Sequence, residues 1–330
     1  MIYRARDFLD EPAPRAYPLS IHAFAKLNLG LRVGRLRPDG YHDIDTVFQT
    51  IDFGDTLHAR PRPRGVRLRV VRKGPARRAG FAVPQTSKNL VVRAARLLQA
   101  RFGVRTGADL LLVKRVPAGS GLGGGSSDAV AALRLLGRLW NLRGLEKEGV
   151  KLARELGSDC AFFWKGGRAR ARGRGERLRS LRLLGGKKTI TLVVPRSGVR
   201  TLDAYRWLDE SRRGSKDLTA WKRLHTIDAL RGARETESPV FRAGENDFEE
   251  VVGRHCPQVH AAKRLLVEQG VGSVRMSGTG SAVFGVLPRE RDPVEVLHRL
   301  GRTPFDVVMT RFTRFGSLWC RKGRPARMRP

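Results

Sequence analysis

Hydrophobic and polar positions along the chain follow two periods, one typical of strands and one of helices. Residues 21–33 and 47–51 form apolar runs of strand length, and 189–194 is a third such run. Residues 89–102 carry apolar side chains at the three- and four-residue spacing of an amphipathic helix, and 126–140 repeats that spacing. The pattern therefore predicts mixed strands and helices around a buried core.

The pattern is less regular in the rest of the chain. Residues 109–116 are expected to be a strand and 147–156 a helix, whereas 166–179 alternates arginine with alanine or glycine, as a strand with one solvated face does. Residues 210–246 are polar and predict no definite element. After them helices and strands alternate, and the expected elements are 248–252, 259–269, 271–275, 282–286, 293–300 and 305–311.

A chain of 330 residues is long enough for two domains. We expect an N-terminal extension at residues 1–18, because three prolines and mixed charges there do not suit a core element. A first domain is expected at 19–170 and a second at 171–311, with residues 312–320 returning to the first domain as its last strand. The basic tail, 321–330, is expected to be disordered.

The net charge of +34, from 65 Lys and Arg against 31 Asp and Glu, is the unusual feature of the composition. Such a field attracts polyanions, so nucleic-acid binding is one interpretation. The other is general arginine enrichment, with anionic small molecules as the specific partners. The second is favoured, because no basic helix, aromatic-interleaved RNA motif or zinc-finger spacing gathers the arginines. We therefore expect no specific nucleic-acid partner.

Membrane and disulfide signals are weak. No apolar run approaches the roughly 18 residues of a membrane span, and the N-terminal residues lack the apolar core of a signal peptide. Cys160, Cys256 and Cys320 form no CxxC pair, which argues against a disulfide framework. His255 and His260 lie near Cys256 but lack a fourth ligand, so no protein metal site is assigned. We expect a cytoplasmic protein without a membrane partner; the oligomeric state stays open.

A glycine- and serine-rich segment, PAGSGLGGGSSD at residues 117–128, lies between a predicted strand and a predicted helix. Its five glycines let the backbone approach an anion closely, and the start of the helix adds free N–H donors. The serine hydroxyls can cap the helix or contact phosphate or Mg²⁺. A flexible linker is the alternative, but the flanking strand and helix argue against it. The segment therefore predicts a phosphate-binding loop.

Three other nucleotide-binding motifs match parts of the chain, but each lacks a neighbouring feature that the motif requires. Residues 119–124 satisfy the dinucleotide-binding fingerprint, but Glu146, at the acidic position, lies between two predicted helices where that motif needs a strand. No lysine follows the glycines, which excludes a Walker A loop. Residues 52–54 spell the magnesium motif of protein kinases without the HRD sequence that accompanies it.

The loop at 117–128 resembles the second motif of the GHMP kinase superfamily, which includes galactokinase and the homoserine and mevalonate kinases. The sequences AKLNL at 25–29 and SGTGS at 277–281 agree with two further motifs of that superfamily. Within it, RPDGYH at 37–42 resembles the 4-diphosphocytidyl-2-C-methyl-D-erythritol kinases, and the resemblance covers roughly residues 20–315 in colinear order. Further matching segments are KNLV at 88–91, LGSD at 156–159 and NDFE at 246–249.

The resemblance implies a two-domain α+β fold: an N-terminal α/β domain, a C-terminal ferredoxin-like domain, and an active site in the cleft between them. It also implies an ATP-dependent, Mg²⁺-using kinase that phosphorylates the 2-hydroxyl of 4-diphosphocytidyl-2-C-methyl-D-erythritol, a cytidine diphosphate-linked methylerythritol of the non-mevalonate isoprenoid precursor pathway. A GHMP kinase acting on a homoserine- or mevalonate-type alcohol is an alternative, against which Tyr41 and His42 argue. A basic nucleic-acid-binding protein is another.

The catalytic residues implied by the resemblance are Lys26 and Asp159. Asp159 would accept the proton of the substrate hydroxyl, and Lys26 would stabilise the developing negative charge or hold Asp159 ionised. Asn28 would orient either group. Without the family, Asp159 is an ordinary capping aspartate and Lys26 a solvated strand-edge lysine. The apolar neighbours of Lys26 favour burial with partners instead.

The resemblance assigns the remaining site residues to two ligands. Tyr41 and His42 would recognise the cytosine, with Tyr41 stacking on one face and Tyr205 on the other, although plain packing explains Tyr205 equally well. Arg200 stands where the family has a small hydroxyl residue, which bears on the loop before Tyr205, and Ser158 replaces the usual alanine. Gly278, Thr279 and Gly280 would close over phosphate or acceptor. The expected ATP-binding residues are Asn89, Pro117, Gly119, Ser120, Gly121, Leu122, Gly123, Gly124, Gly125, Ser126 and Ser127.

Overall fold

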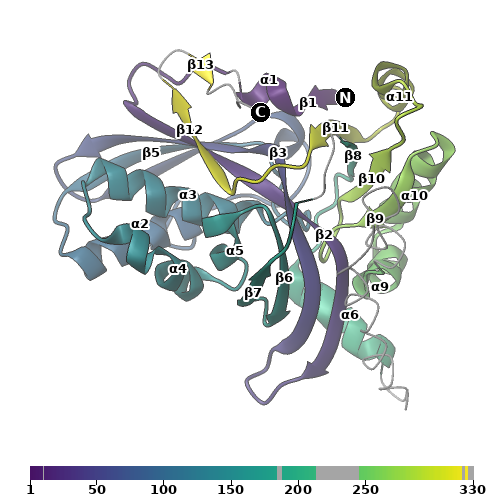
Figure 1. Cartoon of the computed structure of the whole chain (residues 1–330), viewed down its shortest axis with the longest axis horizontal. Helices are drawn as coiled ribbons and strands as arrows, with labels where there is room; N and C mark the ends of the chain where they lie inside the picture. Colours follow the sequence, from purple (N-terminus) through teal and green to yellow (C-terminus); the bar gives the residue numbers. More distant parts are fainter. Residues whose placement is uncertain (10, 184–187, 213–244, 322–323, 326–330) are drawn as a thin grey trace.

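The computed structural model describes residues 1–9, 11–183, 188–212, 245–321 and 324–325. In these residues the chain forms two β-sheets that share an apolar interface, each with helices packed on its other face (Figure 1). The first sheet and its helices come mainly from the N-terminal half of the chain, and the second from the C-terminal half. The expected two-domain α+β fold is confirmed.

The first sheet is organised around a long antiparallel pair, β2 (Leu19–Leu36) and β3 (His42–Arg62). Its strands follow the order β13-β12-β2-β3-β5-β4, and β6 pairs with both β3 and β7. Only β4 and β5 are parallel neighbours in this sheet among the described residues. The other strands are β4 (Val66–Arg72), β5 (Gly107–Lys114), β6 (Arg168–Gly173), β7 (Arg177–Ser180), β12 (Ser317–Arg321) and β13 (Arg324–Pro325).

Four helices cover one face of the first sheet: α2 (Leu90–Phe102), α3 (Gly124–Leu139), α4 (Leu145–Leu156) and α5 (Cys160–Lys165). Their apolar stripes make the first core. α3 is buried almost all round, with alanines at 129, 131 and 132 that let it lie close to the strands below. Because α3 follows the glycine loop directly, this packing holds the start of the helix in one place.

The second sheet has the order β1-β11-β8-β10-β9. Its elements are β1 (Ile2–Arg4), β8 (Thr189–Val194), α6 (Thr201–Arg212), α9 (Phe248–His255), α10 (Pro257–Glu268), β9 (Gly272–Met276), β10 (Val283–Leu287), α11 (Pro293–Leu300) and β11 (Asp306–Arg311). When β8, β9, β10 and β11 are numbered 1 to 4 in chain order, their order across the sheet is 4-1-3-2, and neighbouring strands pair antiparallel. With α11 between β10 and β11, and α6, α9 and α10 between β8 and β9, this confirms the ferredoxin-like second domain.

The two sheets meet through an apolar layer. Leu27 and Phe53 from the first sheet pack in one cluster with Leu192 and Phe284 from the second. The far half of β2 also reaches the second domain, because Leu31 and Val33 pack in its helical core. The β2–β3 pair therefore ties the domains together along the line where the cavity described below opens.

Two strand predictions need correction. The strand expected at 47–51 is the middle of the much longer β3, and the single strand expected at 166–179 is a hairpin, β6 and β7. The turn of that hairpin uses Gly173 and Gly175, both with positive φ, which the arginine–glycine alternation concealed. β4 and α6 are not among the predicted elements, since arginine and acidic residues dilute their apolar patterns.

The expected domain limits differ from the structure at three places. Residues 1–18 are not merely an extension, because β1 pairs with β11 and Phe8 joins the apolar layer between the sheets. The first sheet continues through β7 to Ser180, ten residues beyond the expected limit. The tail expected at 321–330 begins inside a small hairpin, since β13 pairs with β12, and residues 322–323 and 326–330 lie outside the described residues. β12 itself pairs with β2 in the first sheet.

Candidate active site

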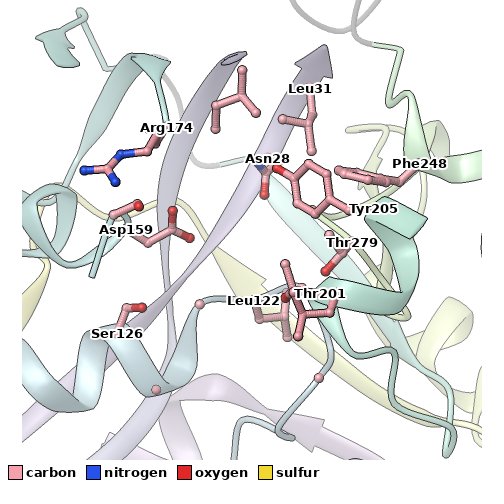
Figure 2. A pocket seen from close by; sticks show the side chains of 18 of the residues that line it. Asn28, Leu31, Leu122, Ser126, Asp159, Arg174, Thr201, Tyr205, Phe248 and Thr279 are labelled. Atoms are coloured by element: carbon pink, nitrogen blue, oxygen red, sulfur yellow. The ribbon is translucent and has the colours of Figure 1, made fainter. Parts of the chain in front are cut away.

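A cavity of about 970 Å³ lies between the two domains (Figure 2). The glycine loop forms one wall, β2 and the tip of the β2–β3 pair another, and the start of α6 closes the opposite side. Figure 2 shows Asp159 and Ser126 on one side of the opening, facing Tyr205, Thr201 and Thr279 on the other. Residues from far-apart parts of the sequence therefore share one volume.

The glycine loop links the end of β5 to the first turn of α3 and is held from two sides. The backbone N–H of Lys26 donates to Leu122 at 2.9 Å, and that of Ala282 donates to Ser120 at 3.1 Å. Gly121 has φ +75°, and a Cβ there would lie 1.9 Å from a backbone oxygen of the opposite loop. Only glycine fits that position, because both the φ angle and the close approach exclude a side chain.

A buried charge cluster supports the base of this loop. The Lys114 ammonium lies against the carboxylates of Asp55 and Asp128, and Asp55 also accepts a hydrogen bond from the Val116 N–H at 2.9 Å. Burial lowers the pKa of Lys114, but Asp128 and Asp55 outweigh it and raise that pKa above its usual value. Burial and the neighbouring Asp55 raise the pKa of Asp128 well above its usual value. The cluster fixes the end of β5 against the first turn of α3.

Lys26 and Asp159 form an ion pair at the floor of the cavity. The Lys26 ammonium lies 3.8 Å from Asp159, donates to the Gly121 carbonyl at 3.0 Å and donates to the Asn28 amide oxygen. Burial lowers the pKa of Lys26, and Asp159 opposes that effect. The Asp159 side chain is 32% exposed, so the carboxylate can meet a ligand from the cavity.

β-bulges position the two polar residues of β2. The register of the β2–β3 pair shifts beside Lys26 and again beyond Asn28, and bulges re-aim the side chains next to them. The Asn28 side chain donates to Thr46 at 2.8 Å, which directs its amide oxygen toward Lys26. The Asn28 N–H donates to the Ser277 hydroxyl, which in turn donates to Gly121 at 3.1 Å. The network joins β2, the glycine loop and the 277–281 loop.

An aromatic recess lies at the far end of the cavity. His42 is buried, stacks on Tyr205 with ring centroids 5.0 Å apart, and has its Nε2 2.9 Å from a carboxylate oxygen of Asp209. Because a carboxylate only accepts, Nε2 carries the hydrogen of this bond. Tyr205 also meets Phe248 edge to face at 4.8 Å, and burial raises the pKa of Tyr205 to about 12. Tyr41 stays 53% exposed at the rim.

The structure places most of the expected site residues on this cavity. The exceptions among them are Asn89, Ser127 and Gly280. Asn89 caps α2, accepting from the Val91 N–H at 2.9 Å, while its neighbour Leu90 lines the cavity. The ligand contacts of all these residues stay predictions. The expected residues that line the cavity are Lys26, Asn28, Tyr41, His42, Pro117, Gly119, Ser120, Gly121, Leu122, Gly123, Gly124, Gly125, Ser126, Asp159, Tyr205, Gly278 and Thr279.

Sequence reasoning missed several lining residues, notably Arg174, Thr201, Arg206, Asp209 and Phe248. Four of these five come from elements that were not predicted, the β6–β7 turn and α6. Phe248 lies in the NDFE segment that carried the resemblance, and that segment was the available signal.

The described residues contain neither a membrane-spanning helix nor a metal-binding cluster. No helix in that part of the chain is long and apolar enough to cross a membrane. No group of three or more His, Cys, Asp or Glu in the same residues is arranged to hold a metal ion. His255 instead stacks on Trp207, with ring centroids 4.1 Å apart.

The arrangement suits phosphoryl transfer. Such a reaction needs an anion-binding cradle for the donor, a positioned acceptor hydroxyl and charge neutralisation between them, with little covalent chemistry. The glycine loop, the Asp159 carboxylate and the Lys26 ammonium supply these three elements within one cavity.

Comparisons with known proteins agree with this geometry. Residues 89–167 match the model of the GHMP kinases N terminal domain, and residues 226–306 match that of the GHMP kinases C terminal domain. The chain is 38% identical to a 4-diphosphocytidyl-2-C-methyl-D-erythritol kinase of Prosthecochloris aestuarii over 86% of this chain and 94% of the relative. It is 38% identical to the enzyme of the same name from Pelotomaculum thermopropionicum over 88% and 96%.

Solved structures are similar as well. A crystal structure of 4-(cytidine 5'-diphospho)-2C-methyl-D-erythritol kinase matches with a TM-score of 0.67 at 29% identity, covering 89% of this chain and 98% of the other. A homoserine kinase from Cytophaga hutchinsonii matches with a TM-score of 0.69 at 18% identity, covering 94% and 99%, and this likeness bears on the fold alone.

Proposed function

The chain belongs to the GHMP kinases and, among them, to the 4-diphosphocytidyl-2-C-methyl-D-erythritol kinase family, and from this we propose that it transfers the γ-phosphate of ATP to the 2-hydroxyl of 4-diphosphocytidyl-2-C-methyl-D-erythritol. This reaction belongs to the non-mevalonate route to isoprenoid precursors. The observation that carries the proposal is the single cavity that joins the glycine loop, the Lys26–Asp159 pair and the aromatic recess.

Asp159 is the proposed general base. Its carboxylate is partly exposed to the cavity, and it would take the proton of the acceptor hydroxyl as the oxygen attacks the γ-phosphorus. Lys26, held by Asn28 and the Gly121 carbonyl, places a positive charge beside that oxygen. The bond between the γ-phosphorus and the bridging oxygen of ADP then breaks, and the ADP phosphates carry away the electron pair.

The glycine loop is the proposed ATP site. Its backbone N–H groups and the N-terminus of α3 favour the phosphates, and Asn89 at the start of α2 is the proposed adenosine contact. Mg²⁺ favours oxygen ligands and keeps few protein contacts when it binds with a nucleotide. The Ser126 hydroxyl lines the cavity and suits that preference, so it would hold the ion together with the phosphates. When bound, it neutralises phosphate charge.

The aromatic recess is the proposed cytosine site. Tyr41 and Tyr205 would stack on the base, and His42 and its backbone would read the edge. Because Nε2 of His42 donates its hydrogen to Asp209, Nδ1 is the ring nitrogen that would meet the edge of the base. Gly278, Thr279 and Gly280 would close over the phosphates or the acceptor. We also propose a cytoplasmic location, since all three cysteines are free thiols.

An acceptor panel tests the proposal. The protein is incubated with ATP and Mg²⁺ and with 4-diphosphocytidyl-2-C-methyl-D-erythritol, homoserine or mevalonate in turn, and ADP release is followed. We expect turnover with the cytidine compound and less than about a hundredth of that rate with the other alcohols, because neither fills the aromatic recess. Equal or faster turnover of homoserine or mevalonate would overturn the acceptor assignment while leaving a kinase.

A further inference from the structure

Arg174 lines the cavity on the same side as Asp159 (Figure 2). It occupies the turn between β6 and β7, flanked by Gly173 and Gly175 with φ of +71° and +108°. The turn packs against the floor of the site, since a Cβ at Gly175 would lie 3.6 Å from Asp159. The Arg174 guanidinium lies over the Tyr41 ring, 4.9 Å from its centroid. Arg174 thus neighbours both the stacking tyrosine and the proposed base.

Arg174 also differs in charge pairing from the other cations that line the cavity. Lys26 faces Asp159, and Arg206 lies 3.5 Å from Asp203 on its own helix. The Arg174 guanidinium forms no salt bridge with a carboxylate of the described residues. It lies over the Tyr41 ring, and its charge helps to lower the pKa of the nearby Asp39, which pairs with Arg37. An exposed guanidinium that forms no salt bridge can pair with an anionic ligand without first breaking an ion pair.

The proposed acceptor carries an anionic group between its base and its alcohol. In 4-diphosphocytidyl-2-C-methyl-D-erythritol a diphosphate joins the cytidine to the alcohol. If the base stacks on Tyr41 and the hydroxyl meets Asp159, the diphosphate lies between these two residues, and Arg174 neighbours both of them. We propose that Arg174 binds the diphosphate of the acceptor and so selects diphosphate-linked substrates. This inference rests on the proposed function and deepens it.

The chemistry of arginine suits this role. The planar guanidinium presents paired N–H donors that match two phosphate oxygens, and its stacking on Tyr41 holds that plane in a limited set of orientations. Lysine at the same place would supply the charge without the fork or the stacking. The neighbouring arginines do not compete, because Arg172 is bound to Asp45 and Arg177 does not line the cavity.

Binding measurements separate the diphosphate from the base. CDP and cytidine are titrated calorimetrically into the protein, with a saturating non-hydrolysable ATP analogue present so that the nucleotide loop is occupied. We compare the wild-type enzyme with Arg174→Ala, Arg174→Lys and the matched surface control Arg177→Ala. We expect Arg174→Ala to weaken CDP binding about tenfold while cytidine binding changes less than about twofold. Arg174→Lys should recover part of the loss, and Arg177→Ala should match the wild type.

Steady-state kinetics provide a second test of the role of Arg174. Arg174→Ala should raise KM for the acceptor by a similar factor and leave kcat and KM for ATP within about twofold, because the contact is made equally before and during the reaction. Equal losses for CDP and cytidine would mean that Arg174 acts only on Tyr41 and the base, and would overturn the inference. Unchanged CDP binding in Arg174→Ala would overturn it too. A wild-type enzyme that binds neither ligand would instead refute the proposed function itself.

Discussion

Replacement of Asp159 by asparagine tests the centre of the proposed mechanism. Asparagine has nearly the same shape but cannot accept the proton of the acceptor hydroxyl. Loss of a positioned general base costs about 10²- to 10⁴-fold in rate. We therefore expect kcat of Asp159→Asn to fall by at least about a hundredfold, with KM for ATP changed little, because the glycine loop is untouched.

The same substitution removes the charged partner of Lys26. At 3.8 Å, a pair near the protein surface attracts by about 4 kcal/mol before screening. Since the Asp159 side chain is 32% exposed, solvent screening reduces this contribution. We expect the free energy of unfolding to fall by about 1–2 kcal/mol. That loss is too small to unfold a typical domain, so the fall in kcat is not explained by unfolding.

A coupled assay of ADP release measures kcat, and urea denaturation measures stability. Asp203→Asn is the matched control, because Asp203 is a carboxylate on α6 that does not line the cavity. Its kcat should equal that of the wild type. A folded Asp159→Asn enzyme that keeps more than about a tenth of the wild-type kcat would refute the role of Asp159 as base.

Three further predictions follow from the site and its surroundings. Gly121→Ala should lower kcat/KM for ATP at least about tenfold, because the added Cβ meets a backbone oxygen at 1.9 Å. A wild-type kcat/KM for ATP in this variant would contradict the loop geometry. Because burial lowers the pKa of Lys26, the rate should decline with rising pH before pH 10.5, and a kcat/KM profile flat up to that pH would argue against a charged Lys26 in catalysis. Burial lowers the pKa of His22 and of His58 to about 4, so the unfolded chain takes up protons between pH 6.5 and 4 that the folded protein does not. The free energy of unfolding should keep its full value above pH 6.5 and fall by about 3 kcal/mol per histidine toward pH 4. In urea denaturation, a variant with glutamine in place of both His22 and His58 should show a smaller fall over the same pH range.

The environment of the two buried histidines could not be predicted from the sequence. His22 and His58 lie in strands among apolar residues, where a lone histidine carries little information. Tertiary contacts decide their state, since Ser20 bonds His58 and Thr56 bonds His22 across the β2–β3 pair. Arg115 adds a nearby positive charge that disfavours protonation of both rings.

The cavity wall opposite the glycine loop was the part least accessible from sequence. α6 carries Thr201, Tyr205, Arg206 and Asp209 to the cavity, but its apolar positions are few and charged residues separate them. A helix with such a weak apolar stripe is stabilised by tertiary packing more than by local preference. Only the fold therefore showed that Asp209 meets His42 across 167 positions of the chain.

Local sequence determined the features whose physics is local. The glycine loop was predicted from its glycines between a strand and a helix, because close backbone approach to an anion needs residues without a Cβ. The apolar periods likewise predicted α2, α3 and β8. The family resemblance, and no local pattern, predicted the pairing of Lys26 with Asp159, which lie 133 positions apart. Tertiary structure alone decided the placement of Arg174 over Tyr41. Those contacts depend on sheet order, bulges and the packing of two domains, which no short stretch of sequence encodes.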